Sequence, residues 1–269
     1  MQFNYILKGD RSQPTILFLH GFMGDCRDFD AVIDLLDEFC CLVVDLPGHG
    51  RTPASIESSY QMGQIALGLT KLLKQLEIEQ CILVGYSMGG RIALYLTIYF
   101  PQFFWGIVLE SASPGLATQP ERDRRILQDL QLSERLIELD FADFLASWYD
   151  NPLFESFKKH PLYARAVERR LRNNPAELAK CLRVNGLGQQ PSLWSRLTEI
   201  NKPLMLIVGE LDTKFMLINR KISDAIPQAC LSIVKDSGHN VHFEHPIRFS
   251  QLLKDFGLEY HRHQMNRKN

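Results

Sequence analysis

Short apolar runs and longer amphipathic segments alternate along most of the 269-residue chain. The runs are 4–8 residues long, and the one at 15–19 is continuously apolar, which is typical of a strand covered on both faces of a parallel sheet. Segments between them, such as 60–76, have apolar residues at helical spacing. The pattern predicts an α/β fold, with a mainly parallel twisted sheet flanked by helices and joined by right-handed crossovers. Strands are expected at 2–8, 15–19, 41–45, 81–84, 106–110, 203–208 and 230–234, and further helices at 28–38, about 216–225 and about 246–256.

The alternation stops after residue 115 and resumes near residue 198. No strand pattern occurs between about 117 and 197, where helical segments rich in Arg, Leu and Glu take over. We therefore expect a helical cap at 116–197, over the carboxyl edge of the sheet, where ligands bind in open α/β folds. Residues 1–115 and 198–260 would form the core, and 261–269 a flexible polar tail.

Ser87 lies within Gly85-Tyr86-Ser87-Met88-Gly89-Gly90-Arg91, between a predicted strand and a predicted helix. The Gly-x-Ser-x-Gly pattern there indicates a sharp strand-to-helix turn, whose flanking positions leave no room for a Cβ atom. Such a turn lifts the serine hydroxyl clear of the sheet and places it at a helix N-terminus. The pattern predicts a nucleophilic serine, against the simpler interpretation of a glycine-rich turn with an incidental serine.

Another strand ends in His20-Gly21-Phe22-Met23-Gly24. This loop predicts an oxyanion hole formed by the backbone N–H groups of Phe22 and Met88. His20 is expected to be a structural hydrogen-bonding residue of the loop. His49, in Asp-Leu-Pro-Gly-His-Gly at 45–50, is expected to be structural too.

Asp212 and His239 each follow an apolar strand, as Ser87 does, so the three should meet at one edge of the sheet. His239 would take the serine proton, and Asp212 would orient the imidazole and stabilise its cation. His242 is an alternative base, although no glycine precedes it. Asp236 is an alternative acid, although it lies too near His239 in sequence to reach it from another strand end.

Composition argues against several classes of function. The net charge of −1 provides no electrostatic basis for binding nucleic acid or an anionic membrane, and no apolar run approaches the ~20 residues of a membrane span. The N-terminus does not resemble a signal peptide. Six scattered cysteines form no metal-binding motif, which favours the cytoplasm and the absence of a metal or cofactor. We expect a small-molecule substrate and a monomer or small homo-oligomer.

These motifs together resemble the α/β-hydrolase fold over nearly the whole chain. Fold alone does not define the reaction, because esterases, lipases, C–C hydrolases and lyases share it. Further segments are similar to the 2-succinyl-6-hydroxy-2,4-cyclohexadiene-1-carboxylate synthases of menaquinone and phylloquinone biosynthesis. They are Gly-Tyr-Ser-Met-Gly-Gly-Arg at 85–91, Ser-Pro-Gly-Leu at 113–116, Trp-Tyr at 148–149 with Pro-Leu-Phe at 152–154, Gly-Gln-Gln-Pro-Ser-Leu-Trp at 188–194, and Gly-Glu-Leu-Asp-Thr-Lys-Phe at 209–215.

The resemblance implies a lyase that eliminates pyruvate from 2-succinyl-5-enolpyruvyl-6-hydroxy-3-cyclohexene-1-carboxylate, a tricarboxylate. Arginines suit carboxylates. Arg91 is expected to bind substrate, because a cation in the first helical turn opposes the helix dipole. Arg125 best matches the binding arginine of the family, and Arg170 is equally well explained as a solvated helix residue. Trp148, Tyr149 and Phe154 either line the pocket or pack the cap, Lys214 is expected near the site, and the Tyr86 hydroxyl would assist the oxyanion hole.

Three rival functions remain open at this point. A carboxylesterase or thioesterase would use the same triad. A C–C bond hydrolase of ring-cleavage dienones tends to have Asn before the serine and Gly-Pro-Gly in the oxyanion loop, where this chain has Tyr86 and Met-Gly-Asp at 23–25. A non-catalytic binding protein would keep the fold, but the intact set of Ser, Asp and His argues against it.

Overall fold

Seven strands form one sheet in the computed structural model, which describes residues 2–54 and 56–268, the side chains of 260–268 excepted. Strand β1 is antiparallel to β3, and every other pair of neighbours is parallel. The tail predicted at 261–269 lies outside the described side chains. The strand order is β1-β3-β2-β4-β5-β6-β7, with bounds β1 (Tyr5–Lys8), β2 (Thr15–Leu19), β3 (Cys40–Val44), β4 (Cys81–Tyr86), β5 (Phe104–Glu110), β6 (Leu204–Gly209) and β7 (Ala229–Val234).

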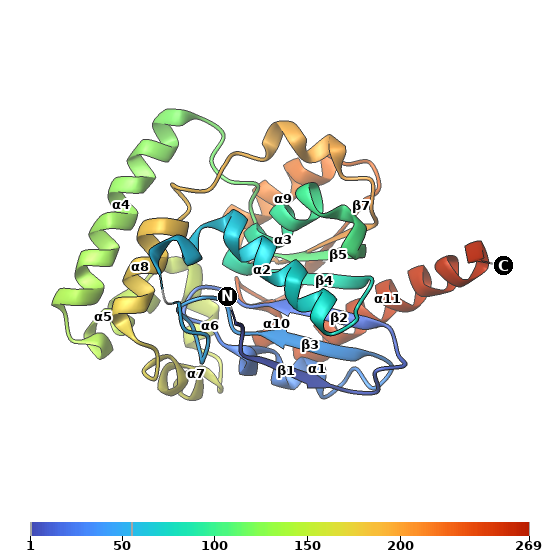
Figure 1. Cartoon of the computed structure of the whole chain (residues 1–269). Coiled ribbons are helices and arrows are strands. Elements are labelled where there is room, and N and C mark those ends of the chain that lie inside the picture. The colour runs from blue at the N-terminus through green and yellow to red at the C-terminus, as the bar shows by residue number, and fades with distance from the viewer. Residues whose placement is uncertain (1, 55, 269) are drawn as a thin grey trace.

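Helices cover both faces of the sheet (Figure 1), which confirms the predicted α/β architecture. Those of the core are η1 (Cys26–Phe29), α1 (Asp30–Ile33), η2 (Glu57–Tyr60), α2 (Met62–Gln75), α3 (Met88–Tyr99), η3 (Pro101–Phe103), η5 (Trp194–Glu199), α9 (Thr213–Ala225), α10 (Val241–Glu244) and α11 (Pro246–Lys268). Those inserted between β5 and η5 are α4 (Gln119–Glu138), α5 (Phe141–Tyr149), η4 (Pro152–Phe154), α6 (Glu155–Lys158), α7 (Tyr163–Arg170) and α8 (Pro175–Asn185).

The continuous apolar character of β2 reflects two hydrophobic layers. Successive side chains of a strand point to opposite faces. Leu17 and Leu19 accordingly pack with helices α2 and α3, whereas Ile16 and Phe18 pack with α1 and α11. The sheet is therefore a rigid support for the loops at its carboxyl edge.

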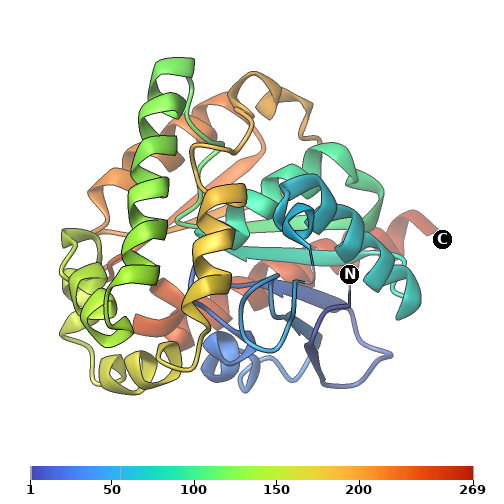
Figure 2. The same ribbon diagram turned by 60° about the vertical axis from the view of Figure 1, so that its left-hand side comes forward.

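The inserted helices stand against that edge as a cap (Figure 2). Helix α4 begins with a capping box, in which Thr118 and Glu121 satisfy each other's backbone N–H groups, and it runs beside α8. A third hydrophobic cluster, which includes Phe144, Phe157 and Leu178, holds the cap together and contacts Met23 of the loop after β2. The cap therefore packs on a loop that we expect to be part of the site.

The expected helix at 28–38 is wrong in extent, because only η1 and one turn of α1 form there. Hydrogen bonds of the i to i+3 type, from Leu35 to Val32 and from Phe39 to Leu36, replace further helical turns. Asp34, Asp37 and Glu38 would have placed negative charge at the negative end of a longer helix. The first strand is also shorter than predicted and begins at Tyr5.

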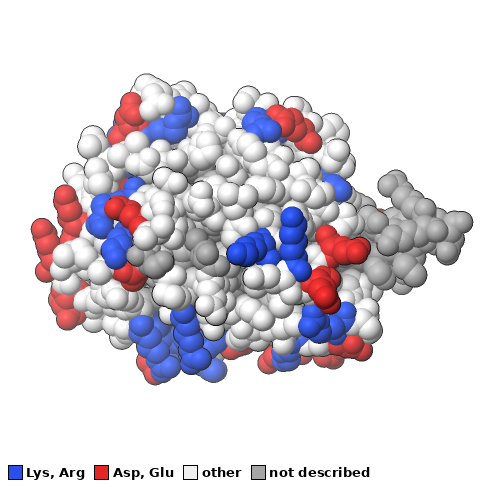
Figure 3. Space-filling model, viewed as in Figure 1, with Lys and Arg blue, Asp and Glu red and all other residues white. Residues whose placement is uncertain are grey.

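Charged groups of both signs are interspersed over the face of the molecule shown in Figure 3. Among the residues that the structure describes, no helix combines the length and apolar character needed to cross a membrane.

Candidate active site

Ser87 lies between β4 and α3 in a strained backbone conformation, with φ 49° and ψ −106°. Its N–H donates to the carbonyl oxygen of Glu110 at 2.9 Å, which ties the turn to the end of β5. A Cβ atom on Gly85 would lie 2.6 Å from the carbonyl oxygen of Gly89, and one on Gly89 would lie 2.1 Å from that of Leu19. The glycines of the motif thus permit the close approach that exposes the serine hydroxyl.

Ser87, His239 and Asp212 form a continuous hydrogen-bonded chain. His239 Nε2 lies 3.1 Å from Ser87 Oγ, and His239 Nδ1 lies 2.6 Å from Asp212 Oδ2. Asp212 caps helix α9 by accepting a hydrogen bond from the Phe215 N–H at 3.1 Å. The imidazole and the carboxylate are both buried, so His239 can accept the serine proton while Asp212 keeps it oriented.

The two alternative residues lie elsewhere. His242 is buried behind Tyr86, with its Nδ1 2.7 Å from Glu110 Oε2. The Tyr86 ring lies between the two imidazoles, with centroid distances of 5.3 Å to His239 and 4.7 Å to His242. Asp236 is exposed in a turn with positive φ. The structure therefore places His239, and not His242, beside the serine.

Phe22 follows β2 and Met88 follows β4, so both lie at the carboxyl edge of the sheet. No acceptor among the described residues takes a hydrogen bond from the backbone N–H of either one. His20 holds the loop from below, because its Nε2 accepts from the Leu46 N–H at 2.9 Å and its Nδ1 donates to the Gly21 carbonyl oxygen at 2.7 Å. His20 thus has the structural position that the sequence indicated, and the oxyanion role of Phe22 and Met88 stays a prediction.

A cavity of about 370 Å³ opens next to Ser87 under the cap. Asp212 lies behind His239 and does not line it. The other predicted site residues do: Phe22, Tyr86, Ser87, Met88, Arg91, Arg125, Trp148, Tyr149, Phe154, Arg170, Lys214 and His239.

One side of the cavity is cationic. Arg91 has two contacts of 3.3 Å, from Nη1 to the backbone oxygen of Asn185 and to Gln190 Oε1. Burial first, and then the nearby charge of Arg125, lower the pKa of Arg91 to about 10. The same two causes lower the pKa of Lys214 at the rim of the cavity. These groups repel one another, and an anionic ligand would relieve that repulsion.

The other side is aromatic. The Trp148 ring lies 5.4 Å from that of Phe22, and the Phe154 ring contacts His239 edge-on at 5.9 Å. Tyr149 and Phe154 are buried and also belong to the hydrophobic cluster of the cap. These aromatic residues thus line the pocket and pack the cap at once, so the two interpretations of the sequence are compatible.

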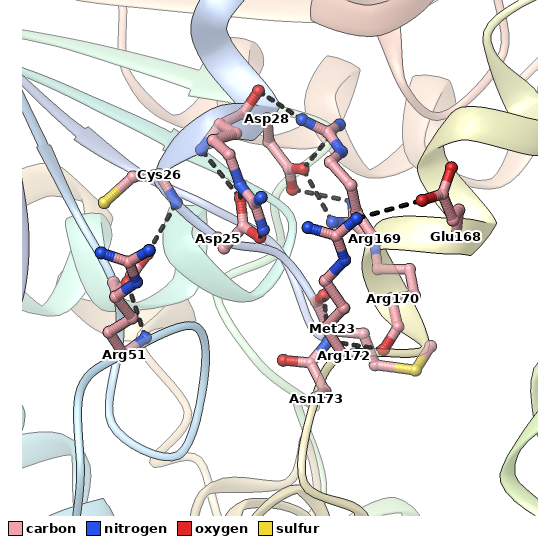
Figure 4. A network of polar contacts seen from close by, with 12 residues as sticks. Met23, Asp25, Cys26, Asp28, Arg51, Glu168, Arg169, Arg170, Arg172 and Asn173 are labelled. Atoms are coloured by element: carbon pink, nitrogen blue, oxygen red, sulfur yellow. Dashed lines mark hydrogen bonds and ion pairs between the residues drawn. The ribbon is translucent and has the colours of Figure 1, made fainter.

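Arg170 reaches the cavity, but its guanidinium is engaged (Figure 4). Its Nη1 and Nη2 donate to Asp28 Oδ1 and Oδ2 at 2.7 and 2.8 Å, and both side chains are buried. Burial opposes the charge, but Asp28 and Tyr149 outweigh it and raise the pKa of Arg170. The expectation of a solvated helix residue is therefore wrong, and the substrate-binding role stays a prediction, with only Nε free of a partner among the described residues.

Several polar groups of the cavity were not predicted from the sequence. Gln128 and Asn185 come from α4 and α8, and Asn240 follows His239. Their residue types carry no motif, so only their positions in the folded chain identify them. Within the described part of the chain, no three His, Cys, Asp or Glu side chains are grouped to hold a metal ion.

Comparison with known proteins identifies the family. Residues 14–246 match the family model of the α/β-hydrolase fold. The 2-succinyl-6-hydroxy-2,4-cyclohexadiene-1-carboxylate synthase of Serratia proteamaculans is 32% identical over 250 residues, which cover 93% of this chain and 95% of that protein. That of Citrobacter koseri is 33% identical over 238 residues, or 88% and 91% of the two chains.

Solved structures are similar as well. MenH from S. aureus superimposes with a TM-score of 0.92 at 32% identity, and the match covers 96% of this chain and 98% of that chain. A thermophilic esterase from Thermogutta terrifontis superimposes with a TM-score of 0.82 at 23% identity and shares the fold alone.

Proposed function

This chain belongs to the 2-succinyl-6-hydroxy-2,4-cyclohexadiene-1-carboxylate synthase family within the α/β-hydrolase fold, and we propose that it catalyses the reaction for which the family is named. The reaction eliminates pyruvate from 2-succinyl-5-enolpyruvyl-6-hydroxy-3-cyclohexene-1-carboxylate in quinone biosynthesis. It needs a base, a site for an enolate oxygen and groups that bind carboxylates. No acyl-enzyme and no cofactor enter the scheme.

Ser87 and His239 act together as the base. The Ser87 oxygen removes the proton next to the succinyl ketone, while its own proton passes to His239 Nε2 across the 3.1 Å contact. Asp212 stabilises the resulting imidazolium. The electron pair of the broken C–H bond moves through the ring alkene and breaks the C–O bond to the enolpyruvyl group. That group leaves as the enolate of pyruvate, and the proton held by His239 converts it to pyruvate, which returns the imidazole to its neutral form.

The developing enolate oxygen is held by the backbone N–H groups of Phe22 and Met88, with the Tyr86 hydroxyl as a third donor. Burial raises the pKa of Tyr86 well above its usual value, so the hydroxyl stays protonated and able to donate. An oxyanion-hole donor typically supplies roughly 3–4 kcal/mol of transition-state stabilisation.

The observation that carries the proposal is the cationic side of the cavity beside the catalytic serine. Arg91, Arg125 and Lys214 line it, and the arginine forks match carboxylates in shape and charge. Simple aryl or alkyl esters have no anionic groups that could pair with three cations. A substrate with three carboxylates has such groups. The aromatic side of the cavity fits its ring.

The test compares pyruvate release from freshly prepared substrate with hydrolysis of p-nitrophenyl acetate. The proposal predicts fast release of pyruvate and slow hydrolysis of the ester. Arg125→Ala should mainly raise KM, because the interaction with a carboxylate exists before the chemical step. An unchanged KM would count against the assigned role of Arg125.

Ester hydrolysis is the second candidate, because an aligned Ser87–His239 pair and two free N–H donors also suit acyl transfer. An initial burst of p-nitrophenol, followed by slow turnover and no release of pyruvate, would favour it.

A further inference from the structure

Asp129 lies one helical turn after Arg125 on α4, and its carboxylate is buried beside the guanidinium. Asp129 Oδ1 accepts a hydrogen bond from Arg125 Nε at 2.7 Å, and the exposed fractions of the two side chains are 2% for Asp129 and 28% for Arg125. Asp129 Oδ2 accepts from the backbone N–H of Gly188 at 3.1 Å. Both carboxylate oxygens are therefore engaged, one by the arginine and the other by the loop after α8.

The bond to Asp129 uses Nε, which leaves the terminal amino groups of Arg125 available. No acceptor within the described part of the chain takes a hydrogen bond from Arg125 Nη1 or Nη2, and the side chain lines the cavity. A guanidinium held at Nε presents a fork that matches a carboxylate. Asp129 thus determines which edge of Arg125 a ligand meets.

The loop at 186–190 is fitted closely to Asp129. A Cβ atom on Gly186 would lie 2.4 Å from Asp129 Oδ2, and one on Gly188 would lie 2.5 Å from the backbone nitrogen of Ile126. Glycines at these two positions allow the loop to approach α4 and donate an N–H to the carboxylate. Asp129 therefore connects the two main helices of the cap, which lie side by side in Figure 2.

The same loop contributes to the surroundings of Arg91. Gln190 of the loop, and the backbone oxygen of Asn185 just before it, take the two contacts from Arg91 Nη1. The buried carboxylate of Asp129 therefore positions two arginines. It binds Arg125 directly, and it holds the loop that contacts Arg91. Asp129 neutralises only one of the two positive charges of Arg125 and Arg91, so a net positive charge remains until an anion binds.

We propose that Asp129 is a positioning residue for carboxylate binding, which fixes the Arg125 fork and the 186–190 loop before the ligand arrives. A preorganised guanidinium loses less conformational freedom on binding. Asp129 should therefore increase the affinity for the ligand and leave the rate of the chemical step unchanged. The inference deepens the proposed function by assigning how its carboxylate-binding groups are held.

The test is Asp129→Asn, which keeps the shape of the side chain but removes its charge and one acceptor. We expect KM for the enolpyruvyl substrate to rise about tenfold or more, with kcat within about threefold of the wild type. The dissociation constant of citrate, a tricarboxylate probe, measured by calorimetry on the intact protein, should rise by a similar factor. An unchanged KM and citrate affinity, or a fall in kcat alone, would overturn the proposal.

Glu168→Gln is the matched control. Glu168, near the end of cap helix α7, pairs with Arg172 at the same i, i+4 spacing, but both side chains are more than half exposed and neither lines the cavity. The control should leave KM, kcat and citrate affinity unchanged.

A double-mutant cycle distinguishes an effect transmitted through Arg125 from a general disturbance of the cap. Asp129→Asn should weaken citrate binding by much less in an Arg125→Ala background, and full additivity would overturn the proposal. Should Asp129→Asn fail to fold, Asp129→Glu keeps the charge but displaces the carboxylate, and undiminished citrate affinity there would also overturn it. Citrate binding requires no turnover. An enzyme that is inactive on the enolpyruvyl substrate would therefore refute the proposed function, whereas citrate binding would still test the positioning role of Asp129.

Discussion

Arg170 of the cap holds Asp28 of the core through two parallel hydrogen bonds of 2.7 and 2.8 Å. Arg169 adds a third contact to the same carboxylate at 3.3 Å, and Asn173 donates to the carbonyl oxygen of Met23 at 2.9 Å (Figure 4). These bonds attach the end of helix α7 to the loop that carries the Phe22 N–H. The cap is therefore tied to the loop after β2 as well as covering the cavity.

Replacement of Arg170 tests whether this link is structural. Arg170→Met would leave Asp28 buried with only the weaker contact from Arg169. Removal of one partner of a buried ion pair typically costs about 3–5 kcal/mol, so we expect the free energy of unfolding to fall by about 3 kcal/mol. Urea denaturation measures it. Unchanged stability together with a raised KM would instead support the substrate-binding role that the sequence predicted.

His49 should make folding sensitive to acid. Burial, and next the neighbouring His20, lower the pKa of His49 to about 3 from 6.5, and its Nδ1 donates to the Pro47 carbonyl oxygen. The neutral form is thus favoured on folding, so its contribution to stability is complete above pH 6.5 and is lost as the pH falls toward 3.

The expected loss between pH 7 and pH 5 is about 2 kcal/mol from this group. Urea denaturation at the two pH values measures it in the wild type and in His49→Asn, whose amide can replace the Nδ1 donor. The variant should lose about 2 kcal/mol less over the same interval. Equal losses in both proteins would show that His49 does not titrate in this way.

Tyr86→Phe tests the third oxyanion donor. The hydroxyl remains protonated because burial, and next the charge of Glu110, raise its pKa. Loss of the donor should lower kcat roughly 10–100-fold and change KM little, because the enolate charge develops only in the transition state. Steady-state kinetics decide the matter, and a raised KM with unchanged kcat would contradict the assignment.

Arg91 should make anion binding weaken at alkaline pH. Its pKa of about 10 in the free protein means that the guanidinium loses its charge as the pH rises through that value. The dissociation constant of citrate should then increase as the pH is raised toward and above that value.

Two variants separate Arg91 from its neighbour Lys214, whose pKa is also lowered. Lys214→Gln should keep this pH dependence, and Arg91→Gln should largely lose it. Identical pH profiles for Arg91→Gln and the wild type would exclude Arg91 as the titrating group.

The triad was predictable because topology alone brings its members together. Ser87, Asp212 and His239 each follow a strand, and the carboxyl ends of parallel strands lie at one edge of the sheet. The glycines of the Ser87 motif also predicted the tight turn, since their close contacts are with backbone atoms.

The cap was predictable only as helices. Hydrophobic periodicity shows that a segment is helical, but the direction of each polar side chain depends on how the helices pack. Arg170 illustrates this, because its partner Asp28 lies 142 positions earlier in the chain. Asp129 carried a local signal, since it lies four residues after Arg125, but that spacing is common on exposed helices and did not indicate burial.

The most direct test of the account is pyruvate release by the wild type and by Ser87→Ala, with substrate generated fresh by the preceding pathway enzyme. The account predicts rapid release by the wild type with slow cleavage of p-nitrophenyl acetate. Ser87→Ala should release pyruvate at least about 10³-fold more slowly while it binds substrate with nearly unchanged affinity. Pyruvate release by Ser87→Ala at the wild-type rate would contradict the proposal that the serine is the base.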